Sequence, residues 1–169
     1  EGIRAERRQL EDLRAVSDKI IDTSNYNVHE LKAQISEVAR KSKQIGAMRI
    51  QIISFGFKYG IPLDADLIID VRFLINPYFV AKLKQLDGED PKIKDFILSN
   101  EDTRAFMNKY LDLLDYLIPM YEKEGKAYLT IGVGCTGGRH RSVVIAEAIA
   151  KQIKNPDRKI MVTHRDIDL

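Results

Sequence analysis

The sequence predicts an α/β fold in which a mostly parallel β-sheet is flanked by helices. The first observation is an almost uninterrupted apolar run over residues 127–133, which is typical of a strand buried on both faces of such a sheet. The second is a glycine-rich, basic turn that joins this run to a helical pattern over residues 142–153. The third is that polar residues follow the ends of other apolar runs. Ligands bind at this carboxyl edge in open α/β sheets, so we expect a phosphate-binding loop there.

The first 47 residues are predicted to form a separate, charged segment. Residues 4–13 read as a charged helix with a thin apolar stripe, and residues 19–22 are a short strand candidate. Residues 22–25 carry a helix-capping signal, and the apolar spacing after them predicts a helix from Val28 to near Gly46. We therefore expect a helix-strand-helix piece ahead of the main domain.

The main domain is predicted to begin with an isoleucine-rich strand over residues 48–54. Residues 54–60 follow as a loop that bends at its two glycines, and residues 67–71 give the second strand. Asn76 and Pro77 mark a turn. The aromatic residues of the 54–60 loop are either packing side chains or ligand contacts, and their spacing leaves both interpretations open.

Two helices are predicted next, over residues 91–99 and 102–121. The second has an amphipathic stripe that we expect to face the core, and Gly125 is placed to end it. The stripe consists of Phe106, Tyr110, Leu113, Leu117 and Tyr121. Beyond the glycine-rich turn and its helix, residues 155–157 are predicted to turn and residues 159–163 to form the last strand.

The glycine-rich turn has the residue types of a phosphate site. Its glycines allow the backbone to approach a ligand closely, while the basic residues supply charge and donors. A helix that begins there adds unpaired N–H groups and the positive end of its dipole. The candidate binding residues of the turn are Cys135, Thr136, Gly137, Gly138, Arg139, His140, Arg141 and Ser142.

Further candidates follow the other predicted strands. Lys58 comes after the first strand, Asp70 and Arg72 come at the end of the second, and His164 and Arg165 follow the last. Residues two apart on a strand point the same way, so Asp70 and Arg72 form either a structural ion pair or a clamp for ligand hydroxyl and phosphate groups. His164 and Arg165 are either solvated residues or part of the site, and spacing alone leaves both open.

Four stretches occur in an order that matches a known family. They are Ser54-Phe-Gly-Phe-Lys-Tyr-Gly-Ile-Pro62, Asp70-Val-Arg-Phe-Leu-Ile-Asn-Pro77, Gly134-Cys-Thr-Gly-Gly-Arg-His-Arg-Ser-Val143 and His164-Arg-Asp166. The chain resembles the RNase adapter protein RapZ (YvcJ) family of bacterial P-loop nucleotide-binding proteins along essentially its whole length. This resemblance implies that residues 1–47 are the end of the P-loop NTPase domain and that residues 48–169 are a ligand-sensing α/β domain.

The resemblance implies a regulatory domain that senses a phosphorylated small molecule, with glucosamine 6-phosphate as the expected ligand. In that interpretation the turn holds the phosphate, while Asp70, Arg72 and Asn76 orient the sugar. The chain departs from the family pattern at Ile75, where a proline is common, and at Tyr78, where some members have a histidine. Both differences bear on the identity of the ligand. By the same resemblance the site also includes Lys58, His164 and Arg165.

Nucleotide binding by this chain itself is not expected. The pattern G-x-x-x-x-G-K-[ST] is absent, since Gly132 to Gly137 is followed by Gly138 and Arg139 instead of the required lysine and hydroxyl residue. We therefore expect no cofactor in this fragment and no hydrolysis of ATP or GTP. For the intact protein the resemblance implies ATP or GTP, a small RNA and a ribonuclease as partners, and a homo-oligomer.

Composition limits the remaining function classes. With 27 basic and 25 acidic residues the net charge is only +2, so RNA contact requires a local basic patch. The single cysteine forms no intramolecular disulfide, which predicts a reducing compartment. No apolar run approaches the roughly 20 residues of a membrane span and no signal peptide is visible, so we expect a cytoplasmic protein without membrane contact. The candidate RNA patch consists of Arg139, Arg158, Lys159 and Arg165.

A second chemistry fits the same turn. Cys135, Arg141 and Ser142 satisfy the C-x5-R-[ST] pattern of cysteine-dependent phosphatases. A cysteine at a helix amino terminus ionises more readily, so its thiolate can attack phosphorus while the arginine and loop amides hold the phosphoryl oxygens. Such enzymes also need a general-acid aspartate, for which Asp70 is the one candidate, and Gly134 replaces the usual preceding histidine. Phosphatase chemistry is therefore the alternative to binding without turnover.

Overall fold

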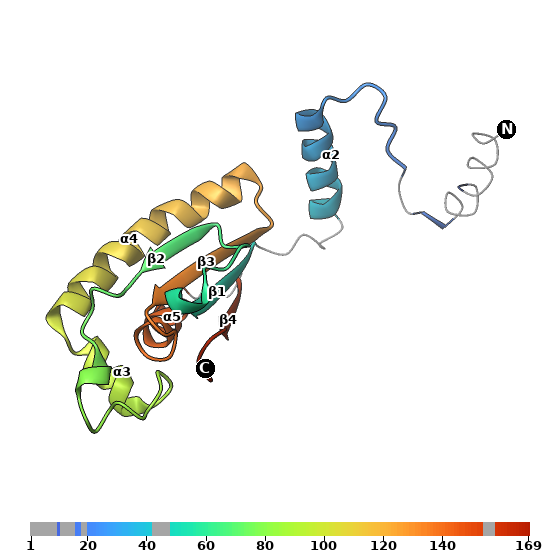
Figure 1. Cartoon of the computed structure of the whole chain (residues 1–169). Helices are drawn as coiled ribbons and strands as arrows, with labels where there is room; N and C mark the ends of the chain where they lie inside the picture. Colours follow the sequence, from blue (N-terminus) through green and yellow to red (C-terminus); the bar gives the residue numbers. More distant parts are fainter. Residues whose placement is uncertain (1–9, 11–15, 18–19, 42–47, 154–157) are drawn as a thin grey trace. The chain divides into compact units, whose positions relative to one another are not determined.

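The computed structural model describes residues 10, 16–17, 20–41, 48–153 and 158–169 (Figure 1). Two compact units are present, residues 1–45 and 46–169, and each is described by itself. Apart from Leu10, the predicted helix over residues 4–13 lies outside the described residues, as does the predicted turn over 155–157. Within the described parts, no helix combines the length and the apolar character needed to cross a membrane.

In the first unit, the predicted helix forms as α2 (Val28–Lys41). Its start is fixed by Asn27 and Glu30 instead of the predicted signal at residues 22–25. The Glu30 amide donates to the Asn27 side chain over 2.9 Å, and the Asn27 amide donates to the Glu30 carboxylate over 3.0 Å. The strand predicted over residues 19–22 is wrong for its described part, because residues 20–22 belong to no strand.

The second unit is built on a four-stranded sheet in which every strand is parallel to its neighbours (Figure 1). The order across the sheet is β2-β3-β1-β4, so two central strands are flanked by β2 and β4 at the edges. This arrangement confirms the predicted α/β class with a parallel sheet. The strands are β1 (Arg49–Gly56), β2 (Leu67–Asp70), β3 (Tyr128–Cys135) and β4 (Lys159–His164).

Among the described residues of this unit, three helices and two short 3-10 turns accompany the sheet. The helices α3, α4 and α5 pack against one another, and α5 also lies against β1, β3 and β4. The 3-10 turn η1 (Phe57–Tyr59) occupies most of the predicted 54–60 loop, because β1 continues to Gly56. The remaining elements are η2 (Pro77–Phe79), α3 (Pro91–Leu98), α4 (Glu101–Glu124) and α5 (Arg141–Gln152).

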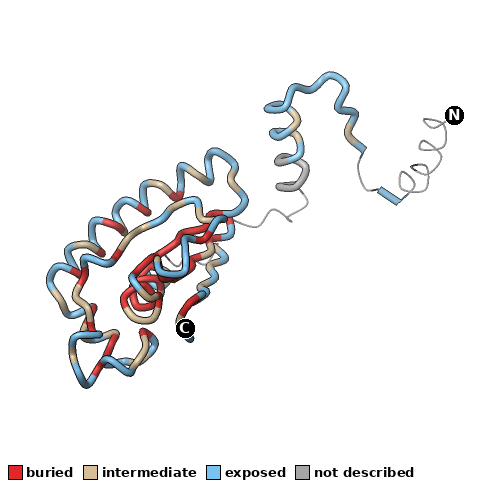
Figure 2. Tube along the Cα trace, viewed as in Figure 1, coloured by how far each residue is buried: buried red, intermediate tan, exposed pale blue. Residues whose placement is uncertain are grey.

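The hydrophobic core lies between one face of the sheet and the helices. Alternate residues of β1, such as Ile50 and Ile52, share this core with Ile131 of β3, Leu114 of α4 and Ile145 of α5. Figure 2 shows buried residues concentrated in β1, β3 and α5, while α4 exposes much of its length. The central strands are therefore rigidly held, which fixes where their carboxyl ends lie.

The opposite face of the sheet is packed by aromatic residues from the end of β1. The rings of Phe55 and Phe57 meet edge to face with their centroids 4.9 Å apart. A Cβ atom on Gly134 would come within 2.5 Å of Phe57 and 2.6 Å of Phe55, so only glycine leaves room for both rings. Phe55 and Phe57 therefore act as packing residues, which was one of the two interpretations of this segment.

The buried stripe of α4 differs from the predicted one. Leu113 was expected in the core but is 47% exposed, whereas Leu114 is fully buried. Tyr110 is buried as predicted, and Phe106 and Tyr121 pack partly buried against the core, so the buried face overlaps the predicted stripe and differs from it most at Leu113. Gly125 ends the helix as predicted, with a φ of 86°. The buried residues of the helix are Thr103, Met107, Tyr110, Leu114 and Ile118.

Candidate functional site

The carboxyl ends of all four strands meet at one edge of the sheet. Pairing in register places Gly56 opposite Cys135, and Gly134 opposite Asp70 on the other side of β3. The pairing of β1 with β4 likewise places Ser54 opposite His164. Because β3 runs directly into the turn that opens α5, the glycine-rich segment lies at the centre of this edge. We call residues 135–142 the anion loop.

The anion loop packs tightly on the end of β1. Gly138 has a φ of +79°, a backbone conformation that side chains disfavour. A Cβ atom there would lie 2.7 Å from Asp166 and 2.8 Å from the Gly56 amide nitrogen. A Cβ atom on Gly56 would in turn lie 2.6 Å from the Gly137 carbonyl carbon. Two glycines facing each other thus let the loop approach the strand closely.

Asp166 holds this contact in place from below the loop. Its buried carboxylate accepts the Gly56 amide over 2.7 Å and pairs with the Arg165 guanidinium over 2.7 Å. Burial alone would raise the pKa of Asp166, but the hydrogen bonds from Arg165 and Gly56 and the Arg165 charge hold that pKa below its ordinary value. Asp166 therefore stays ionised and fastens the β4 terminus to the end of β1.

Arg141 is the first residue of α5, and its side chain is almost fully buried. Its guanidinium donates to the carbonyls of Arg72 and Leu74 and, over 3.2 Å, to the Thr136 hydroxyl. Burial lowers the pKa of Arg141, against the opposing effects of Cys135 and Asp70, yet an arginine keeps its charge at neutral pH. A fixed positive charge therefore lies directly beneath the loop.

Cys135 faces the core side of the loop. Its sulfur lies 3.1 Å from the Ser142 hydroxyl and accepts the Gly138 amide over 3.2 Å. The residue is buried, with 3% of its surface exposed, and it belongs to the hydrophobic core. These contacts brace the two ends of the loop against each other, which gives the thiol a structural role.

Five successive backbone amides at the start of α5, those of residues 139–143, have no hydrogen-bond acceptor among the described residues. By contrast, the Val144 amide donates to the His140 carbonyl over 3.1 Å, so the helical hydrogen-bond ladder begins there. Unpaired amides at a helix start, next to a buried guanidinium, are what an oxyanion binds.

Arg139 and His140 turn away from the loop toward a neighbouring segment, residues 85–88. Arg139 donates to the Gln85 carbonyl over 3.2 Å, and His140 donates from Nε2 to the Leu86 carbonyl over 2.6 Å. Burial is the main cause that lowers the pKa of His140, although the bond to Leu86 acts in the other direction. The Arg139 Nε–H is buried without a partner in the described residues. The contacts of both side chains with residues 85–88 thus hold the loop in position.

Asp70 and Arg72 form an ion pair beside the loop. Arg72 binds the Asp70 carboxylate through Nε and a terminal nitrogen at 2.7–3.0 Å, and its guanidinium lies 4.3 Å from the centre of the Phe57 ring. The hydrogen bond from Arg72 is the main cause that lowers the pKa of Asp70. The pair is about half exposed, so it forms a rim that solvent and a ligand can both reach.

The other predicted site residues are held by contacts of their own. Asn76 caps η2 by accepting the Tyr78 amide over 3.2 Å. The Lys58 amide donates to the Thr136 carbonyl over 3.2 Å, while its ammonium lies over the ring of Tyr59. Lys58 therefore touches the loop through its backbone. Arg165 binds Asp166 and the Gly60 carbonyl.

His164 lies on the helix side of the sheet edge. Its Nδ1 is 2.9 Å from the buried Ser54 hydroxyl and its Nε2 is 3.2 Å from the Glu147 carboxylate of α5. These contacts tie β1, β4 and α5 together beneath the anion loop. The structure thus brings residues 135–142, Asp70 and Arg72 into one group, and gives His164 contacts that support it from below.

Comparison with known proteins places this geometry in a family. Residues 48–168 match the family model described as the RapZ C-terminal domain. The chain belongs to this family. A nucleotide-binding protein of Desulforapulum autotrophicum is 54% identical over 169 residues, covering 99% of this chain and 58% of the relative. A nucleotide-binding protein of Trichlorobacter lovleyi is 48% identical over 168 residues, covering 99% of this chain and 59% of the relative.

The chain spans less than two thirds of the length of these relatives. Both relatives carry the name nucleotide-binding protein. Within the described residues of this chain, no group of three or more histidine, cysteine or carboxylate side chains is arranged to hold a metal ion.

Several residues at this edge escaped the sequence analysis. Asp166 stands in the His-Arg-Asp motif but was not assigned to the site, and Ser54 and Glu147 gave no signal. The 85–88 segment could have been noticed from Asp87-Gly88, a dipeptide typical of turns. A Cβ atom on Gly88 would come within 2.7 Å of the His140 carbonyl oxygen, so this glycine lets the segment reach the loop.

Proposed function

We propose that this RapZ C-terminal domain is a regulatory domain that binds a phosphorylated small molecule through the anion loop. The observation that carries the proposal is the run of unpaired amides at residues 139–143 above the buried Arg141 guanidinium. A phosphate group accepts several N–H bonds at once, and its charge complements both the guanidinium and the helix dipole. A neutral ligand lacks the negative charge that complements the guanidinium and the helix dipole.

The surroundings of the loop favour a small polar ligand. The Asp70–Arg72 pair offers a carboxylate and a guanidinium at the rim, where sugar hydroxyl and amino groups find both an acceptor and donors. Thr136, which is exposed, offers a hydroxyl at the mouth of the loop. A hexosamine phosphate fits these groups, and glucosamine 6-phosphate is our first candidate.

The test uses thermal unfolding with a panel of glucosamine 6-phosphate, other sugar phosphates, inorganic phosphate, ATP and GTP. The variant Thr136→Glu introduces a negative charge at the mouth of the loop, and Thr136→Gln is its neutral control of equal size. Both lose the hydroxyl contact with Arg141, and their unliganded melting temperatures show how each replacement changes stability, including the attraction between the new carboxylate and the Arg141 guanidinium. We expect a sugar phosphate to raise the melting temperature of the parent chain and of Thr136→Gln, but not of Thr136→Glu.

Two results would contradict the proposal. One is an absence of response by the parent chain to every phosphorylated compound in the panel, including inorganic phosphate. The other is an equal response from the glutamate and glutamine variants, since a phosphate held by the loop must be repelled by a carboxylate at its mouth.

The phosphatase alternative has less support from the geometry. Cys135 is buried and engaged by Ser142 and Gly138, and Asp70 is held by Arg72 in its ionised form. A general acid must carry a proton to the leaving group, which a carboxylate with a lowered pKa does poorly. Turnover of an aryl phosphate that disappears in Cys135→Ser would favour this alternative.

For the intact protein we propose coupling of this domain to ATP or GTP bound elsewhere, in a cytoplasmic homo-oligomer that acts on a small RNA and a ribonuclease. The candidate RNA patch does not form one cluster. Arg158 and Lys159 lie at the start of β4, whereas Arg139 and Arg165 follow the carboxyl ends of strands. The five steps along β4 separate these two pairs of residues by about 17 Å. An RNA in contact with all four residues must therefore span the sheet edge.

A further inference from the structure

His140 lies at the junction between the anion loop and α5. It is the residue immediately before the helix, and its own amide is one of the five N–H groups at residues 139–143 that have no acceptor in the described part of the chain. An oxyanion bound to these groups therefore lies next to this residue. The charge on its imidazole and the charge of the anion must then influence each other.

The imidazole is held so that it can take up a proton without moving. Its Nε2 donates to the Leu86 carbonyl over 2.6 Å, and since a carbonyl only accepts, Nε2 carries a hydrogen in both the neutral and the charged ring. Among the described residues, Nδ1 has no hydrogen-bond partner and is not enclosed by protein atoms, so solvent reaches it. Uptake of a proton at Nδ1 therefore leaves the contact with Leu86 in place.

Without an anion, the surroundings of His140 disfavour the charged imidazole. Burial is the largest cause that lowers its pKa, and the like charges of Arg139 and Arg141 lower it further. The contact with Leu86 and the charge of Asp87 act in the opposite direction but do not outweigh them. The ring is therefore mostly neutral at pH 7.

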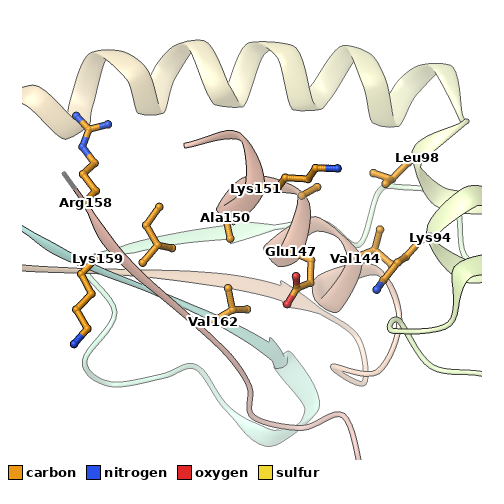
Figure 3. Close-up of a pocket in the computed structure, with 11 residues that line it drawn as sticks. Lys94, Leu98, Val144, Glu147, Ala150, Lys151, Arg158, Lys159 and Val162 are labelled. Carbon is orange, nitrogen blue, oxygen red and sulfur yellow. The ribbon is translucent and has the colours of Figure 1, made fainter. Parts of the chain in front are cut away.

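The other charged side chains around the loop have contacts of their own or lie in a different place. At the strand ends the ion pairs are Asp70 with Arg72 and Asp166 with Arg165. Beside the 85–88 segment, Lys84 lies over the Tyr78 ring and Asp90 accepts the Lys92 amide. Lys94 of α3 and Glu147 of α5 line a groove between α5 and β4 that contains no residue of the anion loop (Figure 3). A bound anion thus adds a negative charge that these groups do not supply.

We propose that anion binding at the loop is coupled to uptake of a proton from solvent at Nδ1 of His140, so that acidification strengthens binding. This inference rests on the proposed function, since it concerns the same loop. The anion offsets the like charges of Arg139 and Arg141, and by linkage the proton raises the affinity for the anion by the same factor. A phosphate monoester itself loses charge below about pH 6, and the charged histidine offsets that loss.

The test follows the titration of His140 by NMR of the histidine rings in the full chain, between about pH 5 and pH 8. The three histidine signals are assigned by through-bond correlation, so His29 and His164 serve as internal controls. Titrations are recorded in sodium chloride, in sodium sulfate of equal ionic strength, and with glucosamine 6-phosphate. Sulfate keeps both charges over this pH range, so its binding separates titration of the histidine from titration of the ligand. Chemical shifts of the amides of residues 139–143 report binding itself.

We expect each bound anion to raise the pKa of His140 by about one unit relative to sodium chloride, while the titration midpoints of His29 and His164 shift less. By linkage, the parent chain should bind sulfate about five- to tenfold more tightly at pH 5 than at pH 8. His140→Gln should lose most of this ratio, whereas His29→Gln, which removes a histidine of α2, should keep it. Melting temperatures of both variants establish that they fold.

Three outcomes would overturn the inference. If the His140 signal titrates identically with and without an anion that shifts the loop amides, the inference fails and the proposed function stands. If His140→Gln keeps the full affinity ratio between pH 5 and pH 8, the dependence belongs to another group. If neither sulfate nor glucosamine 6-phosphate shifts the loop amides, the inference and the proposed function fail together.

Discussion

At the scale of single residues, the basic side chains of the anion loop mostly bind protein carbonyls. Arg139, His140 and Arg141 donate to carbonyls of residues 72, 74, 85 and 86. These contacts hold the backbone in a conformation in which the amides of residues 139–143 have no acceptor within the described part of the chain. In this loop, then, side chains supply the position and charge, and the backbone supplies most of the donors.

The two glycines at the tip of the loop should respond differently to substitution. Gly138→Ala forces a positive φ on a side chain and a contact of 2.7 Å with Asp166, so we expect it to destabilise the chain by about 1–3 kcal/mol. A Cβ atom on Gly137 meets no atom within 4 Å, so Gly137→Ala should change stability by less than about 0.5 kcal/mol. Urea unfolding of both variants checks this. Equal losses would mean that the loop packs differently on β1.

The lowered pKa of His140 predicts that the stability of the chain depends on pH. Its pKa in the folded chain is lowered, chiefly by burial, from an ordinary value near 6.5. The unfolded chain therefore takes up a proton before the folded chain does, and the stabilisation present above pH 6.5 is lost as the pH falls through the folded pKa. We expect His140→Gln, which keeps a donor for Leu86, to reduce the loss of stability between pH 7.5 and pH 5.

Urea unfolding of the parent chain and His140→Gln at several pH values measures this difference. His164→Gln is the matched control, because His164 also lies at the sheet edge but contacts Ser54 and Glu147. A pH profile for His140→Gln that is as steep as that of the parent chain would show that this histidine titrates normally.

At the scale of elements, the fold depends on which face each helix buries. In α4 the predicted and the buried stripes share Tyr110 but differ at the neighbouring leucines, because the helix turns Leu114 and not Leu113 toward the core. In α5 the buried face packs on the sheet, and Glu147 lies beside His164. Helix phase, more than helix length, decides which residues can reach the site.

Adjacent leucines in α4 test this phase. Leu114 is fully buried in the hydrophobic core, so Leu114→Ala should cost about 2–5 kcal/mol. Leu113 is 47% exposed, and Leu113→Ala should cost less than about 1 kcal/mol. Thermal or urea unfolding compares the two substitutions, which remove the same atoms. The reverse order of losses would restore the stripe predicted from the sequence.

At the scale of the whole molecule, residues 46–169 form a compact unit with its own sheet and core. We expect a fragment of residues 46–169 to unfold in one cooperative transition by circular dichroism and fluorescence. The fragment should also keep the response to a sugar phosphate, because every residue of the anion loop and its supports lies within it. Transitions that differ between the two probes would show that the core is incomplete without the preceding residues.

Local patterns predicted a large share of this molecule correctly. The isoleucine-rich run became β1, the apolar run before the glycines became β3, and Gly125 ended its helix. Errors arose where tertiary contacts override local preference. Residues 20–22 have strand-like composition but belong to no strand, and β1 runs on to Gly56 because Cys135 pairs with it.

By itself the sequence determined the α/β class and the place of the anion loop between a buried strand and a helix, because apolar periodicity and glycine content are properties of neighbouring residues. Only the tertiary structure decided which groups support the loop. The carbonyls that hold His140 and Arg141 are 54 and 69 positions away, and Asp166 lies 110 positions from the Gly56 amide that it accepts. Strand register and close packing bring such residues together, and no local pattern encodes either.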